Sequence, residues 1–206
     1  MFSLASLEAR LGRLLADPPA NAFDASTPRH GDHVLNADLS GAAARPAAVL
    51  VPLVAHAGGM TVLLTQRAAA MREHSGQVAF PGGKIDEADG SPLAAALREA
   101  EEEIGLASAR ITPLGYLDPY QTGTGFRIQP VVALVMPPFE LAINPLEVEA
   151  AFEVPLAFLM NPDNHLRHSR AWQGRERFFY AMPYGERYIW GATAGILRNL
   201  YERLYS

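Results

Sequence analysis

The chain has 206 residues, of which 49% are hydrophobic and 19% are charged, so it can bury the core of one domain. It contains no cysteine, which excludes disulfides, thiolate nucleophiles and zinc–thiolate sites and fits a cytoplasmic protein. The net charge of −5 argues against nucleic-acid binding, and no apolar run approaches the roughly 20 residues that span a bilayer. We therefore expect no nucleic-acid partner and no membrane partner.

Residues 1–44 are predicted to form an N-terminal helix and an irregular arm, ahead of a domain over residues 45–206. Leucines recur at helical spacing between residues 3 and 16, which predicts an amphipathic helix there. The proline- and glycine-containing segment that follows is typical of a linker or a surface arm. A leucine stripe on so short a helix must pack on something. Two interpretations remain open: contact with a second copy in a homodimer, or packing on the same subunit.

The main domain is predicted to mix strands and helices. Apolar runs bounded by turn residues predict strands at residues 49–54, 61–65, 111–119, 127–136 and 148–154. The first two of these runs flank a Gly-Gly pair and are expected to form a hairpin. Residues 92–104 predict a strong helix, with Ser91 as its N-cap and Gly105 at its end. A closing helix is predicted over residues 191–204.

The helix predicted over residues 92–104 carries a dense patch of carboxylates. Glu99, Glu102 and Glu103 lie at positions i, i+3 and i+4 and therefore share one face. Like charges at this spacing cost about 0.2–0.5 kcal/mol per pair, which a divalent cation would offset. Oxygen ligands favour Mg²⁺ first and Mn²⁺ second. Taken alone, the patch has a second interpretation, which is a solvated acidic face.

A glycine-rich loop precedes this helix and gives the carboxylates their context. The loop reads Phe80-Pro81-Gly82-Gly83, and its two glycines let the backbone come close to a ligand or a metal ion. Alone, such a loop is an ordinary turn. Followed by an acidic linker and an Arg-Glu-x-x-Glu-Glu helix, it becomes a specific constellation.

This constellation resembles the Nudix box, whose pattern is G-x5-E-x7-R-E-U-x-E-E-x-G-U with U a bulky apolar residue. The second half matches over residues 98–106, although Ala100 is small for its apolar position. The first half departs: the box is one residue longer than the general pattern, and Asp89 stands where the first glutamate is expected. The resemblance implies a Nudix α/β/α sandwich with a mixed, curved sheet.

A second motif resembles the coenzyme A pyrophosphatase branch of the Nudix hydrolases. It reads Leu64-Thr65-x-Arg67-Ala68-x3-Arg72-x3-Gly76-x3-Phe80-Pro81-Gly82-Gly83-x2-Asp86. The resemblance covers roughly residues 45–203 and implies metal-dependent hydrolysis of the diphosphate of coenzyme A or its thioesters. The products would be adenosine 3′,5′-bisphosphate and 4′-phosphopantetheine or its acyl form.

The resemblance also implies roles for particular residues. Glu99, Glu102 and Glu103 are the expected metal ligands, with Mg²⁺ or Mn²⁺ as cofactor, and a backbone carbonyl of the glycine loop is a further candidate. Arg98 is expected to pair with a neighbouring carboxylate and fix the helix. For the general base, Glu147 is the first candidate outside the box. Further candidates for this base are Glu149, Glu153 and Glu103 itself.

The expected substrate contacts are cations and aromatic rings near the glycine loop. Arg67 and Arg72 flank the loop and are candidates for phosphate binding, with ordinary salt bridges as the alternative. The loop residues Phe80, Gly82 and Gly83 are further candidates for contact with substrate. Two more aromatic side chains, Tyr120 and Phe126, are candidates for contact with adenine or pantetheine. Each of these rings, Phe80 included, belongs more often to a core than to a substrate contact.

Two other functions remain open at this point. A Nudix hydrolase could instead cleave ADP-ribose, NADH or damaged nucleoside triphosphates. A protein of another class could keep the fold as a binding module without turnover. The complete set of three glutamates disfavours the binding module, because a pure binder has no need of mutually repelling carboxylates.

Overall fold

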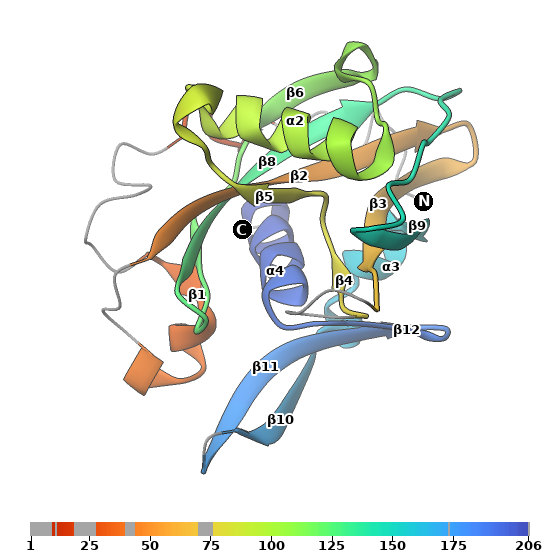
Figure 1. Ribbon diagram of the computed structural model, residues 1–206. Coiled ribbons are helices and arrows are strands. Elements are labelled where there is room, and N and C mark those ends of the chain that lie inside the picture. The colour runs from red at the N-terminus through yellow and green to blue at the C-terminus, as the bar shows by residue number, and fades with distance from the viewer. Residues whose placement is uncertain are drawn as a thin grey trace.

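A mixed sheet forms the centre of the fold (Figure 1). The computed structural model describes residues 10, 12–18, 28–39, 44–69, 76–172 and 174–205. Within these residues, nine strands join in one sheet with the order β1–β7–β8–β2–β3–β4, while β5, β6 and β9 pair with β2, β8 and β3. Their bounds are His30–Gly31 (β1), Arg45–His56 (β2), Gly59–Arg67 (β3), Val78–Ala79 (β4), Gly82–Lys84 (β5), Ile111–Tyr116 (β6), Tyr120–Gln121 (β7), Phe126–Val135 (β8) and Val148–Pro155 (β9).

Strand β2 runs parallel to β8 and antiparallel to β3, and the hairpin between β2 and β3 is the one predicted from the sequence. Ala48, Leu50 and Val54 of β2 belong to the apolar cluster on one face of the sheet. Val51 and Leu53 belong to the cluster on the other face. A strand buried on both faces reads as a nearly continuous apolar run, as this one does.

Helices cover both faces of the sheet, as Figure 1 shows. Helix α2 (Pro92–Ile104) packs on one face, and α4 (Ala192–Tyr205) packs on the other. The short α3 (Leu156–Leu159) adds to the α4 side. The predicted mixed sheet between two helical layers is therefore confirmed.

The bounds of α2 follow from local chemistry. The Ser91 side chain accepts a hydrogen bond from the Ala94 N–H at 3.1 Å, and Pro92 occupies the first turn, where its missing N–H costs nothing. Gly105 ends the helix at a φ of 65°, in the left-handed region that glycine enters without strain. The predicted caps are confirmed.

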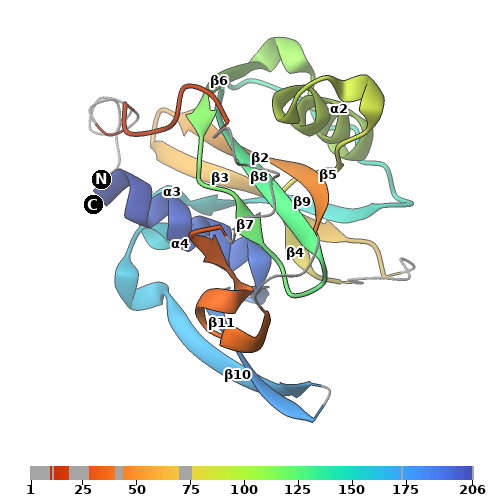
Figure 2. The same cartoon turned by 90° about the vertical axis from the view of Figure 1, so that its left-hand side faces the viewer.

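A second, antiparallel sheet of three strands extends from the body of the molecule (Figure 2). Its strands are β10 (Leu166–Trp172), β11 (Arg175–Tyr184) and β12 (Arg187–Trp190). The sequence analysis predicted no strand here. Most of β10 is exposed on both of its faces, so it lacks the apolar alternation by which strands are recognised.

The helix predicted over residues 3–16 is wrong at its C-terminal end, because residues 12–16 are not helical. Leu15 instead forms an isolated bridge with Tyr116, with N–H···O distances of 3.0 and 2.8 Å. Leu14 is buried in the core of the same domain. This part of the chain therefore packs on its own subunit, while residues 1–9 and 11 lie outside the described residues.

Residues 28–39 join the two sheets, as Figure 2 shows beside β7 and β11. The Asn36 amide both donates to the Phe178 carbonyl and accepts from the Phe178 N–H, each at 2.9 Å. Asp38 accepts hydrogen bonds from Arg175 and Arg177, which lower the pKa of its carboxyl to about 2. In the described part of the chain, no helix is long and apolar enough to cross a membrane.

Candidate active site

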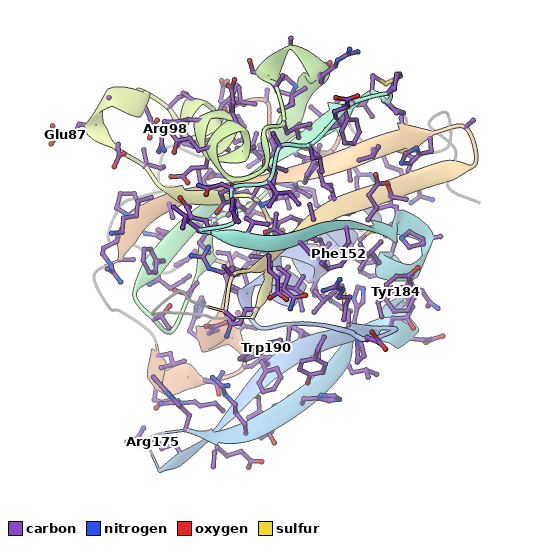
Figure 3. The ribbon with its side chains drawn as sticks, turned by 45° about the vertical axis from the view of Figure 1, so that its right-hand side comes forward. Glu87, Arg98, Phe152, Arg175, Tyr184 and Trp190 are labelled. Carbon is purple, nitrogen blue, oxygen red and sulfur yellow. The ribbon has the colours of Figure 1, made fainter. Side chains whose placement is uncertain are left out.

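A cleft of about 470 Å³ is lined by residues of the main sheet, the glycine loop, α2, the start of α4 and the small sheet. In Figure 3, Arg98 marks the α2 side, and Trp190 lies where the small sheet meets the body. The polar and aromatic side chains that line the cleft come from widely separated parts of the sequence: Asp32, Arg67, Gln77, Phe80, Lys84, Glu99, Glu103, Thr122, Thr124, Phe126, Glu147, Arg170, Trp190 and Thr193.

Glu103 is the most deeply buried carboxylate of the cleft, with an exposed fraction of 3%. Its Oε2 accepts a hydrogen bond from the Gly82 N–H at 3.2 Å, and its Oε1 lies 3.8 Å from Arg67 Nη1. Burial raises the pKa of Glu103 to about 7, although these two partners favour the charged form. The negative charges of Glu99 and Glu147 raise it further.

Glu99 lies against the glycine loop. A Cβ on Gly83 would lie 2.5 Å from the Glu99 Oε1, so the glycine leaves room for this carboxylate against the loop. Burial raises the pKa of Glu99, and the charges of Glu102 and Glu147 act in the same direction. The predicted pairing of the loop with the acidic helix face is thus present in the structure.

Arg98 connects helix α2 to Asp89, in the acidic segment before the helix, through hydrogen bonds. Its Nε and Nη2 donate to the two Asp89 carboxylate oxygens at 2.8 and 3.1 Å. Its Nη1 donates to Glu99 at 3.0 Å and to Glu102 at 3.1 Å. Asp89 therefore occupies the structural position expected of the first glutamate in the box, with the shorter side chain accepting both bonds of the guanidinium fork.

Glu102 is placed differently from the other two glutamates. Its side chain is 55% exposed, is held by Arg98 and does not line the cleft. Of the three predicted metal ligands, the structure therefore brings Glu99 and Glu103 together at the cleft. Glu102 lies beside them on the same helix face, turned toward Arg98.

Glu147 comes to the same place from the loop before β9. Its Oε1 accepts a hydrogen bond from Asn144 Nδ2 at 3.3 Å, and its carbonyl accepts one from the Ala68 N–H at 2.9 Å. The two other candidate bases on β9 do not line the cleft. Glu149 is exposed, and Glu153 contacts Thr61 and lies 2.6 Å from His56 Nε2.

The predicted substrate-binding residues divide into those that line the cleft and one that cannot be placed. Arg67 lies at the acidic end, next to Glu103. Phe80, Gly82 and Gly83 also line the cleft, although Phe80 is otherwise buried in the core. Arg72 lies outside the described residues.

The two weaker aromatic candidates have different positions. Phe126 lines the cleft, with the Arg45 guanidinium 4.0 Å from its ring centroid. Tyr120 is buried, packs against Gly195 and donates its hydroxyl to Asp32 Oδ1 at 2.7 Å, so it positions Asp32.

The sequence analysis missed several polar and aromatic side chains of the cleft. Asp32 comes from the segment interpreted as an arm, and Arg170 and Trp190 come from the small sheet. These residues reach the cleft only through contacts between distant segments.

The acidic end of the cleft has the donor chemistry of a site for a hard cation. Among the described residues, no three histidine, aspartate or glutamate side chains converge closely enough to hold a metal ion as they stand. The donor set nevertheless fits: Glu99 and Glu103 are partly or fully buried, and burial and mutual repulsion raise the pKa of each. A bound cation would compensate both penalties.

Comparison with known proteins identifies the family. The sequence profile of the NUDIX domain matches residues 44–176, which is more than half of the chain. The chain belongs to the Nudix family. An uncharacterized Nudix hydrolase, NudL, of Escherichia coli (strain K12) is 40% identical over 156 residues, 76% of this chain and 81% of the relative. NudL of Cronobacter sakazakii is 41% identical over the same shares.

Solved Nudix structures are also similar to this chain. The NUDIX domain of Shewanella oneidensis NrtR, complexed with ADP ribose, matches with a TM-score of 0.49 and 21% identity, over 78% of this chain and 86% of that one. The Nudix hydrolase RenU of M. smegmatis matches with a TM-score of 0.48 and 25% identity, over 58% and 74%. The family profile and the NudL relatives confirm the prediction of a Nudix hydrolase at the level of the family.

Proposed function

We propose that this Nudix hydrolase cleaves the diphosphate of coenzyme A or its thioesters. One observation carries the proposal. Arg67, Phe80 and Gly83 belong to the motif that resembles the coenzyme A pyrophosphatase branch, and they line the same cleft as Glu99 and Glu103. Residues of the motif and of the acidic helix therefore line one and the same cleft.

The proposed cofactor is Mg²⁺ or Mn²⁺, with Glu99, Glu102 and Glu103 as ligands. When bound, such an ion neutralises diphosphate charge and lowers the pKa of water. Glu99 and Glu103 already line the cleft, and Glu102 belongs to the set because it shares their helix face. Arg98 acts as the positioning residue, since it holds Glu99 and Glu102 against the Asp89 linker.

Hydrolysis needs a group that takes a proton from the attacking water. We assign this role to Glu147, which lines the cleft beside Glu99 and Glu103 and is oriented by Asn144. The water oxygen attacks phosphorus, the bridging phosphorus–oxygen bond breaks, and the proton passes to Glu147. The products are adenosine 3′,5′-bisphosphate and (acyl-)4′-phosphopantetheine.

Arg67 is the proposed contact for the diphosphate. Its guanidinium lies at the acidic end of the cleft, 3.8 Å from Glu103, where a diphosphate would place its negative charge. Arg72 is proposed as a second contact from the same motif. Arginine suits this task because its planar fork binds phosphate oxygens in pairs.

The test is a substrate panel with Mg²⁺ and with Mn²⁺: coenzyme A, acetyl-coenzyme A, ADP-ribose, NADH and an oxidised nucleoside triphosphate. We expect the highest kcat/KM for coenzyme A or its thioester. A higher kcat/KM for ADP-ribose, NADH or the triphosphate would reassign the substrate within the family. No turnover of any member would favour the binding module.

Two further expectations belong to this proposal. A homodimer remains a proposal, since residues 1–9 and 11 lie outside the described residues, and light scattering of the full chain tests it. A cytoplasmic location, expected from the absence of cysteine, suits a substrate that is a small metabolite.

A further inference from the structure

Arg170 is a cation on the wall of the cleft that the small sheet contributes. It lies on β10 and lines the same cleft as Glu99 and Glu103, which belong to α2 on the facing wall. Within the described residues, Arg170 makes no ion pair and donates no side-chain hydrogen bond. Its guanidinium lies over the Trp190 ring, whose centroid is 4.6 Å from the guanidinium carbon.

The surroundings of Arg170 add positive charge. Arg170 stands directly opposite Arg177 in the pairing of β10 with β11, and like charges in this position destabilise a sheet. Arg177 has a counter-charge, because Asp38 accepts its hydrogen bond at 2.5 Å. Asp38 also binds Arg175, so one carboxylate serves two cations and Arg170 is left without one.

The Trp190 ring supports the guanidinium of Arg170. Phe179 meets Trp190 in an edge-to-face contact, with 5.1 Å between the ring centroids, which holds the indole in place. Figure 3 shows Trp190 at the junction between the small sheet and the body. The Arg170 guanidinium therefore rests on a rigid aromatic surface, and its N–H donors remain available to an acceptor in the cleft.

Arg170 also borders a side pocket of about 110 Å³ that shares Asp32, Thr124 and Trp190 with the main cleft. Arg177 lines this pocket too. Asp32 is the one carboxylate among these lining residues, and its two oxygens already accept hydrogen bonds from Tyr120 and from the Gly123 N–H, both at 2.7 Å. Both oxygens of Asp32 thus have donors of their own, and no ion pair between Asp32 and Arg170 is formed in the described part of the chain.

We propose that Arg170, resting on Trp190, is a specificity subsite for a phosphate on the ribose of the substrate. The chemical class is a 3′-phosphorylated adenosine, so the inference rests on the proposed function. Arg67 lies beside Glu103 at the acidic end and serves the diphosphate, whereas Arg170 lies on the wall opposite α2. Arg170 would then be the residue that distinguishes coenzyme A from dephospho-coenzyme A.

The test compares binding of adenosine 3′,5′-bisphosphate with binding of adenosine 5′-monophosphate by calorimetry. The two nucleotides share base, ribose and 5′-phosphate, so the ratio of their Kd values isolates the 3′-phosphate. We expect the wild type to prefer the bisphosphate by about 10- to 100-fold, the range for a charge-assisted hydrogen bond. Arg170→Gln should bring the ratio close to one without loss of folding, because Arg170 is exposed and has no polar partner among the described residues.

Arg167→Gln is the matched control. Arg167 lies on the same strand, stacks on the Phe178 ring at 4.4 Å and does not line the cleft. This variant should keep the wild-type ratio. A wild-type ratio near one, an unchanged ratio in Arg170→Gln, or an equal loss in Arg167→Gln would each overturn the subsite.

The proposed function can fail separately from this inference. If the wild type does not turn over coenzyme A but binds the bisphosphate through Arg170, the subsite stands and the substrate is another 3′-phosphorylated nucleotide. If coenzyme A and dephospho-coenzyme A are cleaved with equal kcat/KM and the binding ratio is one, the function stands and the subsite fails. If coenzyme A is the substrate and Arg170 binds its 3′-phosphate, Arg170→Gln raises KM for coenzyme A and leaves kcat unchanged.

Discussion

Replacing Glu103 by glutamine tests whether the buried end of the cleft is built for a cation. The change keeps the size of the side chain and an oxygen that can accept the Gly82 N–H bond, but it removes the negative charge. Folding raises the pKa of Glu103 from 4.5 to about 7, chiefly because burial disfavours the ionised carboxylate. At 1.36 kcal/mol per pKa unit, ionised Glu103 costs the folded protein about 3 kcal/mol.

The sign of the pH dependence follows from this raised pKa. Folded Glu103 binds its proton more tightly than unfolded Glu103 does, so the contribution of this residue to stability is greatest below about pH 4.5 and is lost as pH rises through 7. Without divalent cations at pH 8, Glu103→Gln should therefore be more stable than the wild type by up to about 3 kcal/mol. For a chain of this size the gain corresponds to a rise in Tm of about 6–12 °C, and most of it should disappear at pH 5.

Addition of Mg²⁺ should reverse the order. The cation stabilises the wild type by binding to the folded state, while Glu103→Gln gains little and loses about 100-fold or more in kcat. Thermal unfolding with EDTA and with Mg²⁺, at pH 5 and pH 8, measures all of these quantities. The control is Glu101→Gln, an exposed position on the same helix, which should change neither Tm nor its response to Mg²⁺. A variant that is less stable than wild type at pH 8 in EDTA would refute the reasoning.

Three other substitutions test the remaining parts of the site and fold. Glu147→Gln should lower kcat by about 100-fold or more, as expected for loss of a general base, while Glu153→Gln should leave kcat unchanged in the same steady-state assay. Asp89→Ala should release Arg98 and cost about 1–3 kcal/mol in urea unfolding, with weaker activation by Mg²⁺; unchanged stability would contradict the structural role of the pair. Leu14→Ala should cost about 2–5 kcal/mol, and a cost near zero would show that the N-terminal segment does not contribute to the core.

The parts of the fold that the sequence predicted are those encoded by neighbouring residues. Helix α2 was predicted with its bounds because Ser91 caps it, Gly105 ends it and the residues between have one apolar stripe. The acidic face followed from the spacing of Glu99 and Glu103. Glu147 was assigned only through the family resemblance, since nothing near it in the sequence marks it as part of a site.

The failures come from contacts that the sequence does not reveal locally. The spacing of Leu14 and Leu15 suits a helix, but these residues pair with β6 and enter the core instead. Gly115 permits this approach, because a Cβ there would lie 2.6 Å from the Leu15 carbonyl oxygen. Asp32 and Arg170 reach the cleft through the segment 28–39 and the small sheet, whose contacts join residues more than 80 positions apart.

The negative and positive side chains of the cleft come from different elements of the fold. Helix α2 presents carboxylates on one face and packs another face into the core, and its one cation, Arg98, is already bound to Asp89, Glu99 and Glu102. The positive charges that line the cleft come from other elements: Arg67 from β3, Lys84 from β5 and Arg170 from β10. Because β10 contacts the main sheet little and carries mostly exposed residues, its side chains can change without disturbing the carboxylate helix. If Arg170 binds the ribose phosphate as proposed, substrate choice and hydrolysis depend on separate parts of the fold, and Arg170→Gln should alter the first without altering the second.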